Sequence, residues 1–281
     1  MIRQVAVIGT GTMGRGIAYL SAVAGYDTVI HDVDSGALDA AKANIESTLR
    51  KGVEKGKVEA SAAKAALERI QLATDLEPAV RAADLIIEAV PEDFDLKQNL
   101  FSQADVFCGE ETILASNTSS ISITQLAGSV ERRDRFAGMH FFNPPHAMKL
   151  IEIVRGERTS DDTIAQIREV AQKMGKDPVI VRDTPGFATS RLGVAIGLEA
   201  MRMLEDNVAS AEDIDRAMEL GYNHPMGPLR LSDLVGLDVR LGIAEYLAAS
   251  LGPRFEPPEI LRRMVREGKL GKKTGEGFYR W

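Results

Sequence analysis

Val5-Ala6-Val7-Ile8-Gly9-Thr10-Gly11-Thr12-Met13-Gly14, near the start of the chain, is an apolar run that leads directly into a glycine-rich turn. The four apolar residues are typical of a strand buried in a parallel sheet. The glycines have the GxGxxG spacing: Gly9 permits a tight turn, Gly11 lets a pyrophosphate approach the backbone, and Gly14 lets helix and strand pack closely. We therefore predict a dinucleotide-binding turn made of Gly9, Thr10, Gly11, Thr12, Met13 and Gly14.

A second strand and an acidic residue complete this pattern. The helix expected from about Thr12 to Ala24 ends before Gly25, and a strand at 28–31 leads into Asp32. A carboxylate at that position accepts hydrogen bonds from ribose hydroxyls. Asp32 and Asp34 would repel a 2′-phosphate, and no arginine follows closely, so we predict NAD rather than NADP as the cofactor.

Strand-like and helical segments alternate as far as Thr184. Further apolar runs occur at 70–73, 85–90, 112–115, 150–154 and 179–181, with helical patterns such as 93–106 and 163–174 between them. This alternation predicts an α/β fold with a doubly wound, mostly parallel sheet of the Rossmann type. After the DTPG segment at 183–186 only helical patterns follow, so we expect domains at 1–184 and 185–281, the second smaller and all-α.

The helical domain should bury apolar surface against another chain. Helices are expected at 190–204, 210–220, 229–235, 239–250 and 258–266, with a capping box at Ser210-Ala211-Glu212-Asp213. A small helical domain with this many apolar positions often packs against a second copy. We predict a homodimer formed through this domain.

Polar residues gather at the ends of three successive strands. They lie in EAVPEDFDLK at 88–97, SNTSS at 116–120 and HFFN at 140–143. Loops at the carboxyl ends of parallel strands form the ligand crevice of such folds, and we expect these stretches to line it. For SNTSS, a helix cap leading into 121–127 is the alternative interpretation.

His140 and Glu152 are the candidates for proton transfer. His140 ends a strand-like segment that begins at Phe136, and Glu152 lies within the next apolar run, 150–154. Neighbouring strands could bring the two together, and a carboxylate beside an imidazole fixes its tautomer and stabilises its cation. The alternative is a strand-end histidine beside a surface glutamate.

Composition narrows the class of protein. The 281 residues are 44% hydrophobic and 27% charged, which is ordinary for a soluble globular chain that buries a sizeable core. The net charge of −7 argues against general nucleic-acid binding. Cys108 is the single cysteine, and no leader or membrane-length apolar run is visible, so we expect a cytoplasmic protein with no membrane contact and no internal disulfide. We predict no metal site.

The segment from Asp34 to about Lys57 reads as a long helix with a local excess of positive charge. Thr48, Lys51 and Lys55 fall on one of its faces. A solvated face is one interpretation, and a docking site for the phosphates of a large anionic substrate is the other.

Together these stretches resemble the 3-hydroxyacyl-CoA dehydrogenase family, most closely its stand-alone short-chain members. The resemblance covers essentially the whole chain: VIGTGTMGRGIA, EAVPED with Lys97, ASNTSS, RFAGMHFFNP, MKLIEIV, DTPGF, HPMGP with DLVGLD, and GKKTGEGFY. It implies NAD-dependent, reversible oxidation of a (3S)-3-hydroxyacyl-CoA, with 3-hydroxybutyryl-CoA as the expected substrate. The acyl-CoA is the partner that it implies.

The resemblance also implies roles for individual residues. His140 matches the catalytic base, Glu152 its carboxylate partner, and Ser119 a contact to the substrate oxygen as well as to the cofactor. Other cofactor contacts implied are Asp32, Glu92, Lys97, Asn143 and Lys273, and the implied CoA contacts are Thr48, where relatives often have serine, and Lys55. Ser190 is grouped with the catalytic residues, although many relatives carry asparagine there as a substrate contact.

Two other functions remain open on the sequence. A sugar-acid dehydrogenase of the lambda-crystallin type shares the glycine turn and the His/Glu pair but needs no phosphate-docking helix. A noncatalytic dinucleotide-binding or structural protein would need neither His140 nor Glu152.

Overall fold

The strand that precedes the glycine turn lies inside an eight-stranded sheet with the order β3-β2-β1-β4-β5-β6-β7-β8. The computed structural model describes all residues from Met1 to Trp281. Its strands are β1 (Gln4–Ile8), β2 (Asp27–His31), β3 (Ile70–Ala73), β4 (Leu85–Glu88), β5 (Ile113–Ser116), β6 (Phe136–Phe141), β7 (Leu150–Arg155) and β8 (Asp177–Arg182). All eight belong to the first of two compact units, Met1–Thr184 and Pro185–Trp281.

The sheet is parallel except at one pair of strands. β1 pairs in parallel with β2 and β4, and β4, β5 and β6 continue in the same direction. β7 is antiparallel to β6, and β8 is parallel to β7. Strands β4, β5 and β6 are buried along their whole length, which explains why they read as continuous apolar runs. The prediction of a doubly wound, mostly parallel sheet is confirmed.

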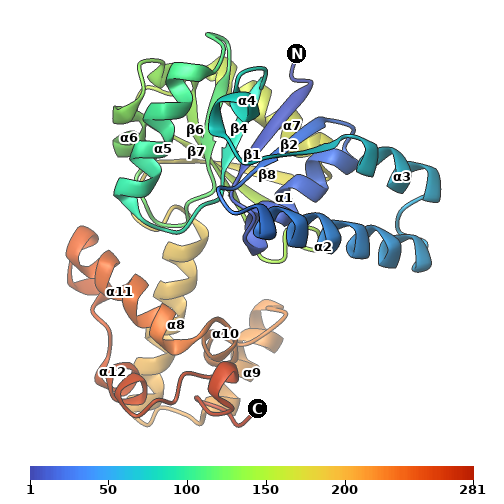
Figure 1. The fold of residues 1–281 in the computed structure, drawn as a ribbon. Helices are drawn as coiled ribbons and strands as arrows, with labels where there is room; N and C mark the ends of the chain where they lie inside the picture. Colours follow the sequence, from blue (N-terminus) through green and yellow to red (C-terminus); the bar gives the residue numbers. More distant parts are fainter. The chain divides into compact units, whose positions relative to one another are not determined.

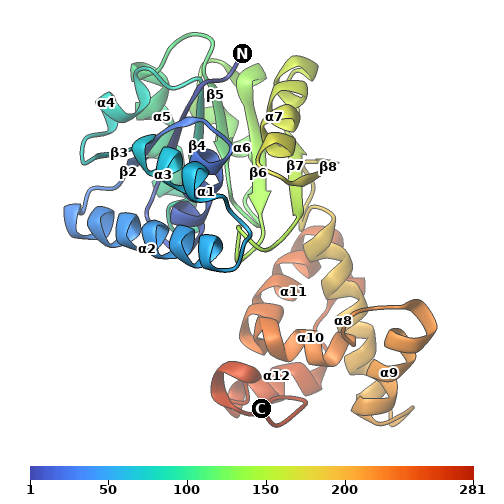
Figure 2. The same cartoon turned by 90° about the vertical axis from the view of Figure 1, so that its right-hand side faces the viewer.

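Helices cover both faces of this sheet (Figure 1). They are α1 (Thr12–Val23), α2 (Ser35–Glu54), α3 (Ala60–Glu68), α4 (Leu76–Val80), α5 (Phe94–Phe107), α6 (Ile123–Leu126) and α7 (Asp161–Lys173). Helices α5 and α6 lie on one face and α1 and α7 on the other, and the view in Figure 2 shows α2 running alongside α1 and α3. Apolar residues of α1, α2, α3 and α7 form one core with the sheet.

The topology places several loops at one edge of the sheet. Because β1, β2, β4, β5 and β6 run in the same direction, the glycine turn and the residues after Glu88, Ser116 and Phe141 all follow carboxyl ends. In folds of this kind ligands bind at that edge.

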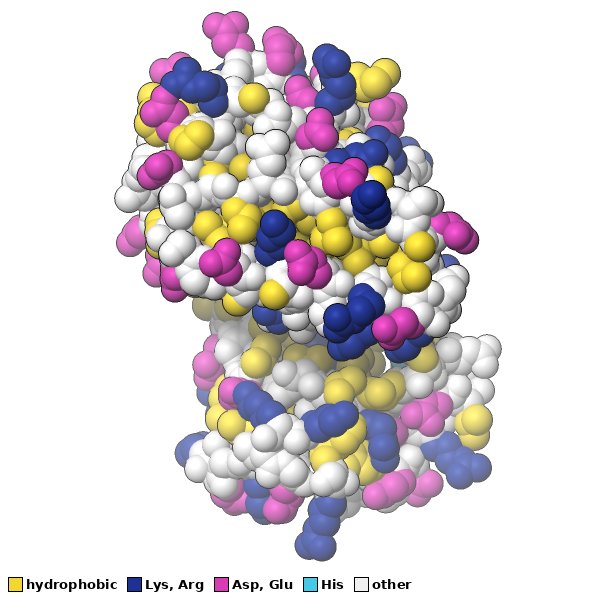
Figure 3. Space-filling model, turned by 45° about the vertical axis from the view of Figure 1, so that its right-hand side comes forward, with side chains coloured by type: hydrophobic (Ala, Val, Ile, Leu, Met, Phe, Trp, Pro, Cys, Tyr) yellow, Lys and Arg dark blue, Asp and Glu magenta, His cyan; other side chains and the backbone are white.

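On the face in Figure 3, basic and acidic side chains are interspersed, so the net negative charge is not gathered into a single region there.

The second unit is built from helices, with two isolated β-bridges near the end of the chain. Its helices are α8 (Thr189–Glu205), α9 (Ala211–Tyr222), α10 (Pro228–Val235), α11 (Leu237–Leu251) and α12 (Glu259–Arg266). They share a core that includes Leu198, Leu229 and Leu247. The Ser210 hydroxyl caps α9 by accepting from the Asp213 amide at 3.1 Å. None of the helices in either unit is long and apolar enough to cross a membrane.

Candidate active site in the first unit

His140 and Glu152 face each other across the one antiparallel pair of strands. They are directly opposed in the register of β6 and β7, so their side chains stand on the same face of the sheet. His140 Nδ1 lies 2.9 Å from Glu152 Oε2. Glu152 is fully buried and His140 is 7% exposed, so this is a desolvated contact and not a surface pair. The sequence suggested neighbouring strands, and the structure adds the register that brings the pair together.

Glu92 organises the SNTSS segment after β5. Its Oε1 accepts from Thr118 Oγ1 at 2.6 Å, from the Ser119 amide at 2.9 Å and from the Ser120 hydroxyl at 3.0 Å. The Ser119 hydroxyl donates to the same oxygen over a longer 3.3 Å. Burial alone would raise the pKa of Glu92, but the Thr118 hydrogen bond and the Lys97 charge hold that pKa below its ordinary value.

The helix-cap interpretation of SNTSS is therefore wrong. The N-cap of α6 is Ser122, whose side chain accepts from the Gln125 amide. Thr118, Ser119 and Ser120 lie before that cap and bond to Glu92 from the preceding loop.

Lys97 is a buried cation held between two carboxylates. Its Nζ lies 2.5 Å from Glu88 Oε1 and 3.3 Å from Glu92 Oε2, and it donates to the Val90 carbonyl at 3.1 Å. The other Glu88 oxygen accepts from the Ser116 hydroxyl at 2.6 Å. Burial raises the pKa of Glu88, an effect that the Lys97 charge opposes. The pair ties the end of β4 to α5 and fixes where Glu92 stands.

Four of the side chains described above, His140, Glu92, Ser119 and Lys97, line one pocket of about 350 Å³. Its wall includes Glu92, Lys97, Ser119, His140 and Asn143, together with apolar side chains such as Met13 and Phe142. Asn117 Oδ1 accepts from the Phe141 amide at 2.9 Å and so holds the ends of β5 and β6 together. The pocket therefore brings together the imidazole of His140, the carboxylate of Glu92, the ammonium of Lys97 and the hydroxyl of Ser119 on a partly apolar surface.

The glycine turn has the shape that a dinucleotide needs. Gly9 has φ of +104°, and a Cβ there would lie 2.7 Å from the Ala89 carbonyl oxygen. A Cβ on Gly14 would lie 1.9 Å from the Gly9 oxygen, so helix and turn pack as closely as the spacing predicted, whereas nothing lies within 4 Å of a Cβ on Gly11. Asp32 accepts from the Thr10 amide and hydroxyl at 3.1 and 2.5 Å. The open side at Gly11 and the carboxylate at the end of β2 fit a pyrophosphate and a ribose.

The remaining predicted residues lie elsewhere in the chain. Thr48 is on α2, where its hydroxyl donates to the Asn44 carbonyl at 2.9 Å, and Lys55 is the exposed C-cap of the same helix. In the second unit, Ser190 is the second residue of α8, whose N-cap is Ala188. Lys273 Nζ lies 2.5 and 2.6 Å from the two carboxylate oxygens of Asp238.

Glu88, Ser116 and Asn117 are site-forming residues that sequence reasoning did not single out. Each lies within a stretch that is expected to line the crevice, but their hydrogen-bond partners come from other elements: helix α5 and strands β4 and β6. A glutamate as the last residue of an otherwise apolar strand was the available signal, because a buried charge needs a partner.

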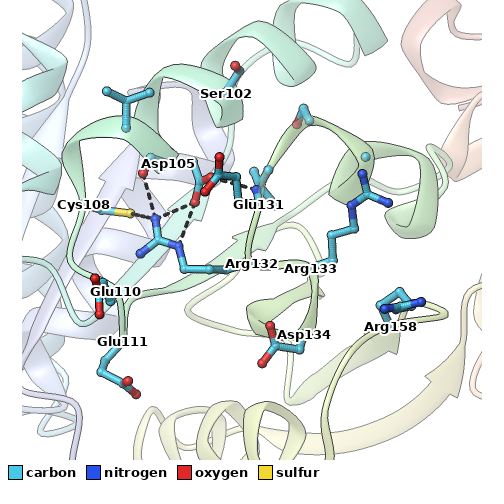
Figure 4. A pocket seen from close by; sticks show the side chains of 14 residues that line it. Ser102, Asp105, Cys108, Glu110, Glu111, Glu131, Arg132, Arg133, Asp134 and Arg158 are labelled. Carbon is cyan, nitrogen blue, oxygen red and sulfur yellow. Dashed lines mark hydrogen bonds and ion pairs between the residues drawn. The ribbon is translucent and has the colours of Figure 1, made fainter.

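A larger groove in the first unit is a different site. A groove of about 1460 Å³ is lined by residues of α5 and of the loops before β5 and β6 (Figure 4). Arg132 enters it and bonds Asp105 Oδ1 at 2.5 Å and Cys108 Sγ at 3.3 Å. Burial raises the pKa of the Cys108 thiol, which therefore carries its proton at neutral pH. None of the predicted site residues lines this groove, so we identify the site by its chemistry and not by volume.

Comparison with known proteins gives a consistent result over both units. The model of the 3-hydroxyacyl-CoA dehydrogenase NAD-binding domain matches residues 4–184, and that of the C-terminal domain matches residues 186–281. A probable 3-hydroxybutyryl-CoA dehydrogenase of Deinococcus radiodurans is 46% identical over 98% of this chain and 99% of its own length. The mitochondrial hydroxyacyl-coenzyme A dehydrogenase of Homo sapiens is 42% identical over 100% and 92%. The crystal structure of (S)-3-hydroxybutyryl-CoA dehydrogenase from Ralstonia eutropha is 42% identical, with a TM-score of 0.96, over 100% of this chain and 99% of that one.

Proposed function

This chain belongs to the 3-hydroxyacyl-CoA dehydrogenase family, and on that premise we propose that it interconverts (3S)-3-hydroxyacyl-CoA and 3-ketoacyl-CoA with NAD. Its first unit is the NAD-binding domain of the family. Relatives that it matches over nearly their full length carry the name 3-hydroxybutyryl-CoA dehydrogenase, which supports a short-chain substrate. The sugar-acid and noncatalytic alternatives are not favoured by these relatives.

The observation that carries the proposal is the His140–Glu152 contact beside a pocket that also holds Ser119. With Nδ1–H donating to the Glu152 carboxylate, the ring presents the lone pair of Nε2 as the base. In the oxidation direction, Nε2 accepts the proton of the substrate hydroxyl as C3 loses its hydride, and Glu152 stabilises the resulting imidazolium. In the reduction direction, the imidazolium returns the proton to the 3-keto oxygen.

Ser119 is proposed to hold the substrate oxygen in line with His140. Its hydroxyl bond to Glu92 is long, at 3.3 Å, while its amide is anchored to the same carboxylate at 2.9 Å. The backbone is therefore fixed, and the hydroxyl can turn toward the substrate. Ser190, on the second unit, is proposed as an additional substrate contact.

The cofactor is proposed to bind along the carboxyl edge of β1, β2, β4 and β5. The turn at Gly9–Gly14 would hold the pyrophosphate and Asp32 the adenosine ribose, and Glu92, Lys97, Ser119, Asn143 and Lys273 are the remaining proposed contacts. NAD, when bound, supplies the acceptor for the hydride that leaves C3. Thr48 and Lys55 are proposed to contact the CoA part of the substrate.

Assembly and location complete the proposal. The second unit exposes large apolar side chains, including Leu192 at 62%, Leu220 at 70% and Tyr222 at 74%. Surface of this kind supports a homodimer formed through 185–281, which a molar-mass measurement in solution would test. With Cys108 as the single cysteine, we propose a cytoplasmic location.

Side-by-side assays test the function. NADH oxidation is measured with acetoacetyl-CoA, longer 3-ketoacyl-CoAs and a keto sugar acid. We expect the highest specificity constant with acetoacetyl-CoA. Activity only with the sugar acid would overturn the substrate assignment, and no activity with any of the three, despite NADH binding, would favour a noncatalytic protein.

A further inference from the structure

Arg240 is a buried arginine of the second unit that has no anionic partner. It is 7% exposed and lies on the buried face of α11, in line with Leu237, Ala244 and Leu247. Its Nε forms no hydrogen bond, and its guanidinium forms no ion pair. Burial lowers the pKa of Arg240, and no neighbouring charge opposes that effect. An ionised group in such an apolar setting is normally accompanied by an anion.

Three aspartates of the second unit are already bound to other partners. Asp215, on α9, accepts from two backbone amides at the start of α10 and from a tyrosine hydroxyl. Asp233, on α10, accepts from two amides and an indole nitrogen of residues 278–281. Asp238, two residues before Arg240 on α11, is held by Lys273 Nζ at 2.5 and 2.6 Å. These carboxylates therefore do not supply the anion that Arg240 lacks.

The end of the Arg240 guanidinium lies against α8, which packs beside α11 (Figure 2). A Cβ at Gly193 of α8 would stand 3.3 Å from Nη1 and 3.9 Å from Nη2, so the glycine makes room for both nitrogens. Ser190 is three residues earlier on α8 and lies on the same face as Gly193. Positions with this spacing are about 5–6 Å apart. Arg240 is therefore one helical turn from a residue that is proposed to contact the substrate.

The electrostatics of α8 also favour an anion at this place. The amino end of a helix of 17 residues carries a partial positive charge. A guanidinium near that end is repelled by it, whereas a carboxylate bound there is attracted by both groups. The planar donors of a guanidinium match the two oxygens of a carboxylate. Arg240 is thus better suited to bind an anionic ligand than to stabilise the unit.

We propose that Arg240 binds a carboxylate at the end of the substrate's acyl chain, so that the enzyme also acts on 3-hydroxyacyl-CoA substrates derived from short dicarboxylic acids. This rests on the proposed function, in which Ser190 contacts the substrate. A six-carbon chain fits, because its terminal carboxylate lies three carbons beyond the reacting C3, a span comparable with the turn of α8 between Ser190 and Gly193. An apolar chain of the same length would leave the Arg240 charge buried and unpaired, so the charge also selects against that chain.

Adipyl-CoA and hexanoyl-CoA separate the terminal charge from the chain length, because both have six acyl carbons and neither carries a 3-keto group. Their dissociation constants are measured by calorimetry. We expect the wild type to bind adipyl-CoA at least about tenfold more tightly, the scale of one charged hydrogen bond. Arg240→Met should abolish this preference. Arg263→Met, which removes one exposed charge from α12, is the matched control and should retain it.

Turnover gives a second measurement of the same preference. NADH oxidation with 3-oxoadipyl-CoA and with 3-oxohexanoyl-CoA yields a ratio of specificity constants. This ratio should be at least about ten in the wild type and in Arg263→Met, and about one or lower in Arg240→Met. Arg240→Lys keeps the charge but loses the planar pair of donors, so its ratio should be intermediate.

Urea unfolding followed by Trp281 fluorescence tests whether Arg240 has only a structural role. Because its charge is unpaired in the ligand-free protein, Arg240→Met should unfold at the wild-type urea concentration or above it. A lower midpoint with an unchanged carboxylate preference would assign Arg240 to the structure, and a smaller molar mass with an unchanged preference would assign it to a contact with a second copy. Either result would overturn the proposal.

The wild-type protein alone can also refute the proposal. Equal binding of adipyl-CoA and hexanoyl-CoA would show that no group of the protein binds the terminal carboxylate. The function is tested separately, by reduction of acetoacetyl-CoA, which has no such carboxylate. Reduction of acetoacetyl-CoA together with equal binding of the two six-carbon thioesters would leave the proposed function standing and remove the role of Arg240.

Discussion

Replacing Lys97 by methionine should lower the unfolding free energy of the first unit far more than the same change at an exposed lysine. The ammonium side chain is 2% exposed and lies 2.5 Å from the fully buried Glu88 carboxylate. Methionine keeps most of the volume but leaves the buried Glu88 carboxyl group without its cation. Removing one partner of a buried pair costs about 3–5 kcal/mol of unfolding free energy, because the remaining charge is uncompensated.

Replacing the other partner, Glu88, should lower the unfolding free energy less than replacing Lys97. This difference tests the account of the buried pair. In Glu88→Gln the lysine still has Glu92, whose Oε2 is 3.3 Å from Nζ and whose side chain is 38% exposed. We expect a loss of about 1–3 kcal/mol, the range for hydrogen bonds to charged groups. The same lysine-to-methionine change at Lys64, whose pair with Glu68 is 4.0 Å long and solvent-exposed, should stay within about 0.5 kcal/mol.

The pH dependence gives an independent check. Burial already raises the pKa of Glu88, and loss of the Lys97 charge should raise it further. A folded-state pKa above the unfolded value means that the folded state binds the proton more tightly, so stability is lost as the pH rises. The destabilisation of Lys97→Met should therefore be small near the ordinary glutamate pKa of 4.5 and grow toward neutral pH.

Urea unfolding is the assay, followed by circular dichroism. Trp281, the only tryptophan, belongs to the second unit and would not report on Lys97 by fluorescence. Curves for wild type, Lys97→Met, Glu88→Gln and Lys64→Met are compared at about pH 5 and about pH 7.5. A loss below about 1 kcal/mol at both pH values, or a loss equal to that of Lys64→Met, would refute the account of the buried pair.

Three further predictions concern the reaction. His140→Ala should lower turnover by about 10²–10⁴-fold while NADH still binds in a fluorescence titration, and unchanged turnover would remove His140 as the base. NADH should exceed NADPH at least about tenfold in specificity constant. Burial would raise the pKa of Asp32, but hydrogen bonds from Thr10 and Asp34 hold it low, so the preference should persist at about pH 5; equal use of the two cofactors would contradict it. Ser190→Ala should cost about 1–2 kcal/mol in specificity constant without lowering the thermal midpoint, since Ala188 is the N-cap of α8, and normal kinetics would take Ser190 out of the site.

Local patterns were enough to predict the sheet and the glycine turn. The spacing of Gly9 and Gly14 encodes a steric requirement within a few residues, and the structure shows both close approaches. The apolar runs predicted the strands because strands buried on both faces have little polar content. The helices of the second unit were visible for a similar reason, since caps such as Ser210 mark their starts.

The partners of polar side chains were not predictable in the same way. Glu88 and Lys97 are nine residues apart and individually look like solvated residues, and only the turn between β4 and α5 buries them together. The SNTSS segment resembles a helix cap because hydroxyls are good caps, yet its acceptor, Glu92, comes from another loop. Long-range pairing depends on tertiary arrangement, which hydrophobic periodicity does not record.

Glu88 and Glu152 are both fully buried in the sheet, and the side chain that each contacts determines what the carboxylate can do. Glu88 faces Lys97 at 2.5 Å and Glu152 faces His140 at 2.9 Å, so both carboxylates are held by a nitrogen cation or donor in a desolvated setting. An ammonium group is a poor proton acceptor near neutral pH, so the Glu88 pair positions Lys97 and takes no part in proton transfer. On the proposed mechanism the His140 ring accepts a proton and returns it, so the Glu152 pair would change charge with each turnover. Exchanging the cations would therefore remove proton transfer from β6 while leaving a buried pair in its place.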